Sequence, residues 1–332
     1  MQTDPLGDGR DREPITQLAI LVVYYLVDDA DLPLLRLHLE RIAQHTSAPY
    51  TLYAATNRVT AQARVEIAAQ PNVVLCVIPP TELQGAHEHA YFLDAMVKVA
   101  LADGASHLVT LDLDSFPIRD DWVEVLQAAA PPESGLTAIL RVENGDSVLP
   151  HPSCTFARRE FFERYEPSFS PKWDGTKKFR RFLRSHRQRP DTGVRLGYIL
   201  WRHRLPWGTM VRTNELEVHY LMAGIYGEVV FHLGASSRRY ILFWRDIQRS
   251  PIHRLTTPLA RVGIKTSGSL RARAAAERRF NLRNLAILSL VREWLLADPE
   301  GFLTYLQGDE LSSGTESWLE RLDLVNSGQA AR

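Results

Sequence analysis

Two carboxylates one residue apart, Asp112 and Asp114, stand at the end of the apolar sequence HLVTLDLD, residues 107–114. A buried β-strand that ends in this pattern brings both side chains to the carboxyl edge of a sheet, where open α/β sheets bind their ligands. Carboxylate oxygens select Mg²⁺ or Mn²⁺, and such an ion commonly bridges protein carboxylates to the phosphates of a ligand. The pattern therefore indicates a metal site for a phosphorylated ligand. An acidic turn after an ordinary strand is the alternative.

A third candidate metal ligand, His232, stands in VVFHLGASSR, residues 229–238, where an apolar run gives way to a small polar loop. A histidine that ends a strand can direct its imidazole to the sheet edge, while backbone N–H groups of the loop face an anion. Ser236 and Arg238 lie in this loop, and arginine pairs with phosphate in a fixed geometry. A histidine satisfied within the core is the competing interpretation.

Asp191 stands in PDTGVRLGYIL, residues 190–200, immediately before an expected helix. Aspartate is a preferred N-cap, so the residue has a structural interpretation. A carboxylate at a helix start, in a segment that is otherwise basic, is also suited to the role of a general base. The sequence leaves both roles open.

Strands and helices that would position these residues alternate over the first 130 residues. Apolar runs predict strands at 17–27, 50–57, 72–78 (stopped by Pro79 and Pro80) and 107–114, and helical spacing predicts helices at 31–46, 60–70 and 84–103. Near-continuous apolar strands alternating with amphipathic helices are typical of a parallel sheet that is covered on both faces. The expected buried helix faces consist of Leu35, Leu39 and Ile42, and of Phe92, Met96 and Val99.

The character of the chain changes after residue 150. From 151 to 213 there are 15 Lys and Arg against 5 Asp and Glu, and the segment 172–189 predicts a basic helix with Phe179, Phe182 and Leu183 on its apolar face. A long helix is expected at 270–297, with Leu285, Leu288, Val291 and Leu295 buried, and the tail beyond 325 is expected to fray.

Composition bounds the class of protein. The 332 residues carry a formal net charge of zero, which does not indicate general attraction to nucleic acid. Cys76 and Cys154 give neither a disulfide framework nor a metal-binding spacing. The longest apolar run, LAILVVYYLV, is about half the length that spans a bilayer, and no signal peptide is visible. We therefore expect a cytoplasmic protein.

The segments LVTLDLDSFPI, PDTGVRLGYIL and VVFHLGASSR, in this order, resemble the motifs of GT-A-type glycosyltransferases with an Asp-X-Asp motif. GAHEHAYFLDAMVKVA resembles the helix that precedes the Asp-X-Asp strand in that family, and the resemblance covers roughly residues 17–240. It implies that Asp114 binds Mn²⁺ or Mg²⁺ directly, that Asp112 contacts the ribose or the metal through water, and that His232 completes the ligands. Asp191 matches the base of inverting members, although Pro190 stands where many of them have a second acidic residue.

The resemblance also implies a division of the chain. We expect a loose arm at 1–16, a Rossmann-like nucleotide-sugar-binding α/β half at 17–150, a mixed acceptor half at 151–250 and a C-terminal helical extension at 251–332. Candidate nucleotide-sugar contacts, in addition to Asp112, Ser236 and Arg238, are residues at the expected strand ends and helix start: Tyr25, Asp28, Asn57 and His89. His151 and Ser153, in the turn LPHPSCTF, are candidate acceptor contacts, with a structural turn as the alternative.

These observations predict a metal-dependent glycosyltransferase that uses a nucleotide-diphospho sugar, with inversion favoured by Asp191. A sugar nucleotidyltransferase would carry a glycine-rich loop after the first strand, where this chain has VVYYLVDDADLP. A dinucleotide oxidoreductase would carry G-X-G-X-X-G there. A non-catalytic nucleotide-sugar-binding protein on the same fold remains a further alternative.

The acceptor is open at this point: a glycan, a natural product or a protein. The basic helix at 172–189 has a structural interpretation as a solvated surface and two functional ones, an anionic acceptor or an anionic membrane surface contacted peripherally. Nucleic acid is not expected, because the charge is local and no nucleic-acid-binding module accompanies it.

Overall fold

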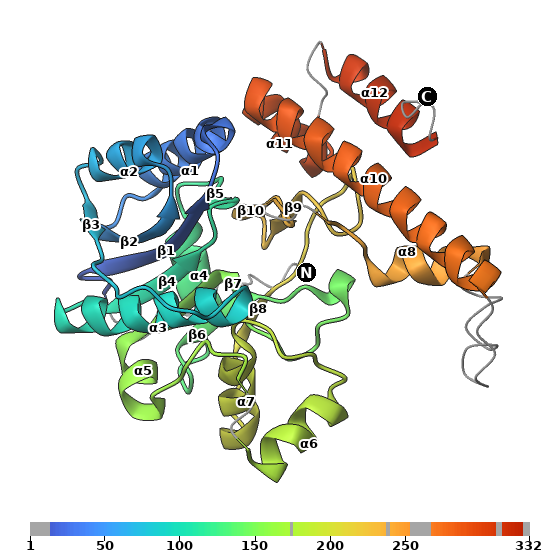
Figure 1. Ribbon diagram of the computed structural model, residues 1–332. Helices are drawn as coiled ribbons and strands as arrows, with labels where there is room; N and C mark the ends of the chain where they lie inside the picture. Colours follow the sequence, from blue (N-terminus) through green and yellow to red (C-terminus); the bar gives the residue numbers. More distant parts are fainter. Residues whose placement is uncertain (1–13, 173–174, 237–239, 253–266, 310–313, 328–332) are drawn as a thin grey trace, which may run out of the picture. The chain divides into compact units, whose positions relative to one another are not determined.

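The protein is described here by a computed structural model, which covers residues 14–172, 175–236, 240–252, 267–309 and 314–327. The chain divides into two compact units, the first formed by Met1–Asn214 and Gly224–His232 and the second by Glu215–Ala223 and Leu233–Arg332. The first unit is a mainly parallel sheet with helices on both of its faces (Figure 1). The α/β class predicted from the sequence is confirmed.

The main sheet has seven strands in the order β3-β2-β1-β4-β7-β6-β8. Only β7 runs against its neighbours β4 and β6, and the other strand pairs are parallel. A second sheet of three antiparallel strands has the order β5-β10-β9. The strand bounds are β1 Leu18–Leu26, β2 Tyr50–Val59, β3 Val73–Leu75, β4 His107–Leu111, β5 Ser115–Pro117, β6 Leu136–Ile139, β7 His151–Arg158, β8 Gly208–Met210, β9 Gly224–Tyr226 and β10 Val230–His232.

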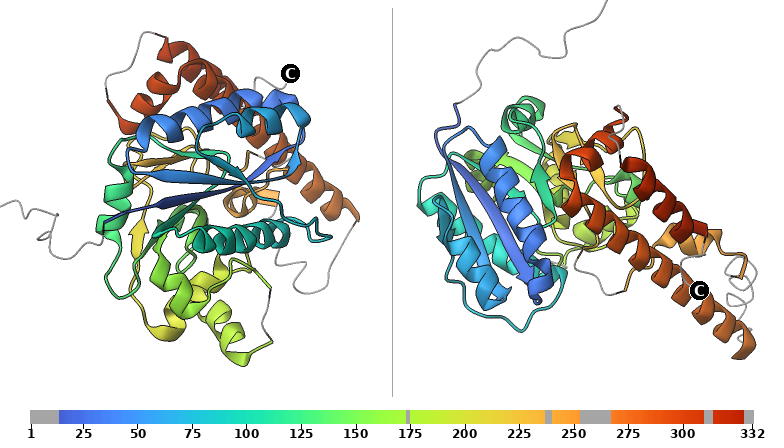
Figure 2. Two further views of the ribbon diagram at one scale, coloured as in Figure 1. Left: turned by 90° about the vertical axis from the view of Figure 1, so that its left-hand side faces the viewer. Right: turned by 90° about the horizontal axis from the view of Figure 1, so that it is seen from above.

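Alternate side chains of β1 supply two separate cores, as the period of a strand requires. Leu18, Ile20 and Val22 pack with residues of α1 (Leu32–His45), α2 (Ala61–Ala68) and α4 (Trp122–Ala129). Ala19 and Leu21 pack on the other face with residues of α3 (Ala86–Ala102), α5 (Arg159–Tyr165) and α7 (Val194–His203). The left view of Figure 2 shows α1 and α3 on opposite sides of β1 and β2.

Several element bounds differ from the sequence-based expectation. The third strand ends at Leu75, before the stop expected at Pro79 and Pro80, and residues 76–80 have no regular structure. Helix α3 buries Phe92 and Met96 as expected, but Val99 is 36% exposed, and Leu93, Val97 and Ala100 complete the buried face instead. The basic helix is shorter than 172–189: α6 spans Lys177–Ser185.

The expected boundary at residue 150 is not a boundary between units. Strand β7, which begins at His151, pairs with both β4 and β6 in the middle of the main sheet. The two halves predicted at 17–150 and 151–250 therefore share one sheet, and the first unit extends to Asn214. The loose arm expected at 1–16 lies, up to residue 13, outside the described residues.

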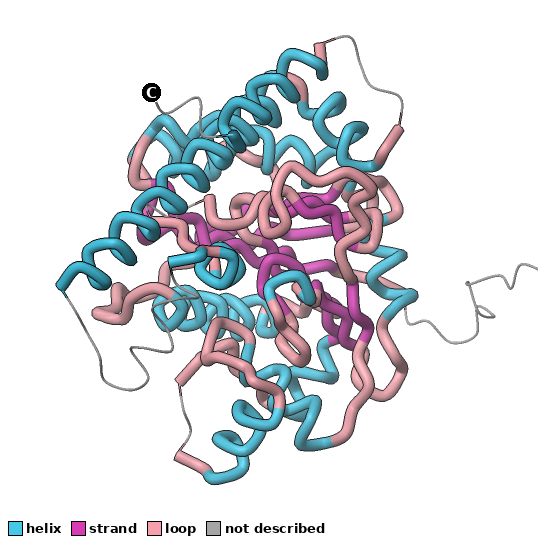
Figure 3. Tube along the Cα trace, turned by 90° about the vertical axis from the view of Figure 1, so that its right-hand side faces the viewer, coloured by secondary structure: helices cyan, strands magenta, loops and turns pink. Residues whose placement is uncertain are grey.

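The second unit is helical. It contains α8 (Trp244–Arg249), α10 (Ser267–Ala297), α11 (Pro299–Gln307) and α12 (Thr315–Ser327). Helix α10 matches the long helix predicted at 270–297, and Figure 3 shows it as one unbroken helix. The buried Trp294 joins α10 to α11 and α12 through ring contacts with Phe302 and Trp318. Among the described residues, none of the helices is both long and apolar enough to span a membrane.

Candidate metal centre

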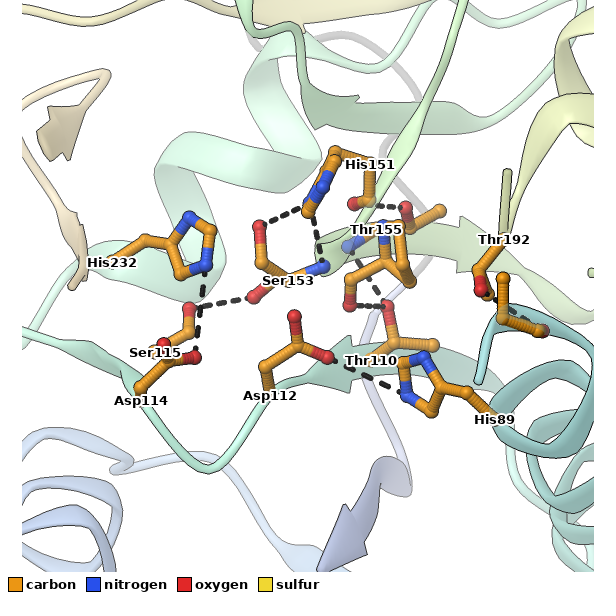
Figure 4. A network of polar contacts seen from close by, with 12 residues as sticks. His89, Thr110, Asp112, Asp114, Ser115, His151, Ser153, Thr155, Thr192 and His232 are labelled. Atoms are coloured by element: carbon orange, nitrogen blue, oxygen red, sulfur yellow. Dashed lines mark hydrogen bonds and ion pairs between the residues drawn. The ribbon is translucent and has the colours of Figure 1, made fainter. Parts of the chain in front are cut away.

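Asp112, Asp114 and His232 meet where the main sheet passes into the small one. Strand β4 ends at Leu111 and β5 begins at Ser115, so both carboxylates lie in the intervening turn rather than on the strand expected over 107–114. Strand β10 pairs with β5 so that His232 stands opposite Ser115. One ligand atom from each of the three side chains lies within 4.8 Å of the others, and His232 Nε2 is 3.6 Å from Asp114 Oδ1 (Figure 4).

The electrostatics of this cluster suit a cation. Burial raises the pKa of Asp112, and the neighbouring Asp114 carboxylate raises it further. Asp114 and His232 are almost fully buried. Little water therefore screens the repulsion between the carboxylates of Asp112 and Asp114. A divalent ion would offset this repulsion, and two carboxylates with one imidazole are a donor set that Mn²⁺ or Mg²⁺ accepts. The residues present therefore fit the predicted metal.

A chain of buried hydrogen bonds holds the metal-binding turn. His38 Nδ1 of α1 donates to the Ser115 carbonyl over 3.0 Å. The Ser115 hydroxyl donates to the Ser153 carbonyl of β7 over 2.6 Å. These bonds tie the turn after β4 to a helix on one side and to a strand on the other, which positions Asp114 before any ion binds.

The two predicted acceptor residues, His151 and Ser153, lie next to the turn that contains Asp114. His151 Nδ1 is 2.8 Å from the Ser153 hydroxyl, and the His151 ring lies 5.5 Å from that of His232 (Figure 4). His151 is therefore part of the surroundings of the metal centre. Ser153 is fully buried, and its hydroxyl is hydrogen-bonded to His151, so the Ser153 hydroxyl is not presented to solvent.

The predicted nucleotide contacts are only partly brought together. His89, near the start of α3, places Nε2 3.5 Å from Asp112 Oδ1, and burial lowers its pKa to about 4 while Asp114 acts in the opposite direction. Tyr25 is exposed near the end of β1, and Asp28 accepts from the Ala30 N–H at the start of the short helix η1 (Asp29–Asp31). Asn57 is exposed and donates to the Ile78 carbonyl.

Two predicted phosphate contacts, Ser236 and Arg238, stand in the loop after His232. Ser236 is half-buried and belongs to the second unit. Arg238 lies outside the described residues. Their predicted contacts with phosphate stay predictions.

Asp191 is exposed and does not cap α7. The N-cap is Gly193, which has a φ of 88° and no side-chain capping bond, whereas Asp191 Oδ1 accepts from the Thr192 N–H over 2.8 Å. The interpretation of Asp191 as a helix cap is therefore wrong. Burial is the main cause of the raised pKa of Asp112 and of Asp146, and the charge of Asp191 raises both slightly further.

A second polar cluster beside the centre was not predicted from the sequence. Arg141 is half-buried just after β6, and its charge counteracts the upward shift of the Asp112 pKa. Its Nε lies 3.5 Å from Glu143, which accepts a 2.6 Å hydrogen bond from the Tyr226 hydroxyl. Asp146 is buried nearby and accepts from Gln188 Nε2 over 3.0 Å. The only signal in the sequence is the run of charges in RVENGD, residues 141–146, which is common in exposed turns.

Comparison with known proteins gives structural likenesses alone. No family model matches the chain, and no curated protein matches it. A mannosyltransferase from Pyrobaculum calidifontis, in complex with GDP-Man and Mn²⁺, is similar over 97% of this chain and 91% of its own, with 14% identity and a TM-score of 0.38. The galactosyltransferase LgtC, in complex with donor and acceptor sugar analogues, is similar over 59% of this chain and 73% of its own, with 10% identity and a TM-score of 0.35. CMP:2-keto-3-deoxy-manno-octonic acid synthetase with CTP is similar over 59% and 89%, with 12% identity and a TM-score of 0.37. These likenesses assign no role to any residue of this chain.

Proposed function

We propose that the protein is a metal-dependent glycosyltransferase that moves a sugar from a nucleotide-diphospho sugar to an acceptor. The observation that carries this proposal is the convergence of Asp112, Asp114 and His232 at the carboxyl edge of a mainly parallel sheet. A divalent ion held there would neutralise the diphosphate of the donor and stabilise the departing nucleoside diphosphate.

The donor side of the proposal assigns the buried residues to the metal. Asp114 and His232 bind the ion directly, and Asp112 contacts it through water or binds the ribose. His89, 3.5 Å from Asp112, orients that carboxylate. Tyr25 and Asn57, near the ends of β1 and β2, and Asp28, just beyond β1, contact the nucleotide together with Ser236 and Arg238.

On the acceptor side, Asp191 is the proposed base. An inverting transfer needs one carboxylate that removes the proton of the acceptor hydroxyl while its oxygen attacks the anomeric carbon. Its exposure to solvent and its small contribution to the raised pKa of Asp112 support this role for Asp191. The acceptor is a glycan, a natural product or a protein, and an anionic acceptor suits the basic helix α6.

The test measures the release of nucleoside diphosphate from a panel of nucleotide-diphospho sugars, with Mn²⁺ titrated into metal-free protein. The wild type should hydrolyse one donor slowly without acceptor, and the Asp114→Asn variant should lose this activity and the metal dependence of nucleotide binding. Asp103→Asn is a matched control, because Asp103 lies at the far end of α3 and its side chain accepts a hydrogen bond from the Tyr53 hydroxyl and, among the described residues, from no other group. It should behave as the wild type does.

The products separate the remaining alternatives. A sugar nucleotidyltransferase would release pyrophosphate from a nucleoside triphosphate in the presence of a sugar phosphate. A non-catalytic protein would bind a nucleotide with Mn²⁺ and release nothing from any donor. Either outcome would contradict the proposal, as would full activity of Asp114→Asn.

A further inference from the structure

The charge of this protein is distributed unevenly. The chain as a whole has 39 Lys and Arg against 39 Asp and Glu, but residues 177–204 contain 10 Lys and Arg and a single acidic residue, Asp191. These residues form α6, the connection after it, and α7, which lie side by side in Figure 1. We call this segment, residues 177–204, the cationic hairpin.

The apolar residues of the cationic hairpin face the protein, and its charges face solvent. Phe179 and Phe182 of α6 are fully buried against Tyr198 of α7, at ring distances of 5.0 and 5.6 Å. No ion pair within the described part of the chain involves the following exposed cations: Lys177, Lys178, Arg181, Arg184, Arg187, Arg189, Arg202 and Arg204. Their charges are therefore available to a partner.

A tryptophan borders this charged surface. Trp201 is 37% exposed at the end of α7, and its ring contacts Phe182, His186 and Tyr198 at 5.6 to 6.2 Å. One side of the Trp201 ring therefore packs on other rings, and the rest of the side chain is exposed to water. A ring held in this way, beside lysines and arginines, has the amphipathic character of residues that sit at a membrane–water interface.

The spread of the cations favours a surface over a small ligand. Lys177, Arg181 and Arg184 follow one another along α6, which is nine residues and therefore about 13 Å long. They extend over more than the width of one phosphate. The negative surface of an anionic membrane is diffuse in the same way and attracts each nearby Lys or Arg separately.

We propose that the cationic hairpin is a membrane-docking surface for anionic lipid. The cationic hairpin is connected to the candidate site in two ways. Gln188 donates a hydrogen bond to Asp146, and the connection between α6 and α7 contains Asp191. The second part of this proposal rests on the proposed glycosyl transfer. Docking by the cationic hairpin would place the membrane on the acceptor side, so that the acceptor hydroxyl belongs to a molecule carried by the membrane.

The experiment is co-sedimentation of the whole protein with phosphatidylcholine vesicles that contain or lack phosphatidylglycerol. It needs no nucleotide sugar, so its result is independent of the proposed enzyme activity. The wild type should bind only the vesicles with phosphatidylglycerol, and added salt should weaken the binding because it screens exposed charges. In the hairpin variant, which lacks four charges, binding should fall by up to about 1,000-fold. This variant carries Lys177→Gln, Lys178→Gln, Arg181→Gln and Arg184→Gln.

A control variant has the same net charge but keeps the hairpin. It carries Gln at four exposed cations elsewhere, Arg64, Lys98, Arg278 and Arg279. This control should bind vesicles almost as well as the wild type does, and both variants should melt at the wild-type temperature. Equal losses in the two variants, or a wild type that binds inorganic polyphosphate but not phosphatidylglycerol vesicles, would overturn the proposal.

Discussion

His232 illustrates how one strand pairing creates the candidate centre. Its neighbours in sequence are apolar, and only the antiparallel register between β10 and β5 sets it opposite Ser115 and beside Asp114. If the imidazole binds the ion, its loss should weaken metal binding more than it weakens the fold.

We therefore expect His232→Ala to raise the Mn²⁺ concentration for half-maximal nucleotide binding by at least about 10-fold, the scale of losing a group that supports or binds a metal. His107→Ala is the matched control, because His107 is equally buried but lies at the opposite end of β4. It should lower the melting temperature without changing the Mn²⁺ requirement. Isothermal titration of both proteins decides the matter, and an unchanged requirement in His232→Ala would remove the residue from the metal.

Asp191 allows catalysis and stability to be separated. Its side chain is exposed and makes one described bond, to the Thr192 N–H, which an asparagine carbonyl can also accept. We expect Asp191→Asn to leave the melting temperature nearly unchanged, while the transfer rate falls by roughly 10² to 10⁴, the usual contribution of a positioned base.

The stereochemistry of the product gives an independent check on Asp191. Transfer with Asp191 as base should give a product of opposite anomeric configuration to the donor, as read from NMR coupling constants. Retained configuration, or an asparagine variant at full speed, would exclude that role.

The three clustered residues of the candidate metal centre could be singled out in the sequence because their types are informative on their own. Asp112, Asp114 and His232 end apolar runs, and a strand end is a local feature. Arg141 and Asp146 could not be predicted in the same way. They reach the centre because β6 lies two strands away from β4, with β7 between them, and no local pattern encodes that order.

The same difference holds for the elements. Strands β1, β2 and β4 follow from apolar runs, and helices α1 to α3 follow from apolar residues at helical spacing, both of which are local patterns. The antiparallel insertion of β7 joins residues far apart in the chain, so that the main sheet continues across the division expected at residue 150. The prolines of LPHPSCTF predicted a turn, whereas strand β7 begins at His151, and the packing of α7 against the residues before it was not predicted.

Helix α7 packs closely against the chain at Val148 because Gly197 has no side chain. A Cβ atom at Gly197 would lie 1.9 Å from the Val148 carbonyl oxygen and 3.1 Å from its carbon. Both are backbone atoms, so α7 itself would have to move. Its N-terminus carries the connection with Asp191 and Gln188, so such a movement would also disturb the acceptor side.

We therefore expect Gly197→Ala to destabilise the protein by about 1–3 kcal/mol, the scale of overpacking. In an isolated helix the same change would stabilise by about 1 kcal/mol, so the sign alone reports the close approach. Chemical denaturation measures it. The variant should also lose transfer activity more than Mn²⁺-dependent nucleotide binding, and a stabilised protein would show that α7 adapts freely.

Across the whole molecule, buried histidines link the fold to pH. Burial lowers the pKa of both His38 and His107 to about 4, below the ordinary value of 6.5. Each side chain is therefore neutral in the folded protein at pH values where it would be protonated in the unfolded chain. The unfolded state then binds more protons, so the stability that is fully present above pH 6.5 decreases as the pH falls towards 4.

His107 is suited to testing this link, since it stacks on Phe156 at 5.4 Å and lies away from the metal-binding turn. His107→Phe keeps an aromatic ring there and removes the titrating group, although it loses the contact with the Ser106 hydroxyl. Relative to its own value at pH 7.5, the free energy of unfolding of the wild type should fall further by pH 4.5 than that of the variant, by up to about 3 kcal/mol for a shift of this size. Urea denaturation at both pH values measures the difference. Parallel losses in the two proteins would show that His107 titrates alike in the folded and unfolded states, and acid sensitivity would then arise elsewhere in the fold.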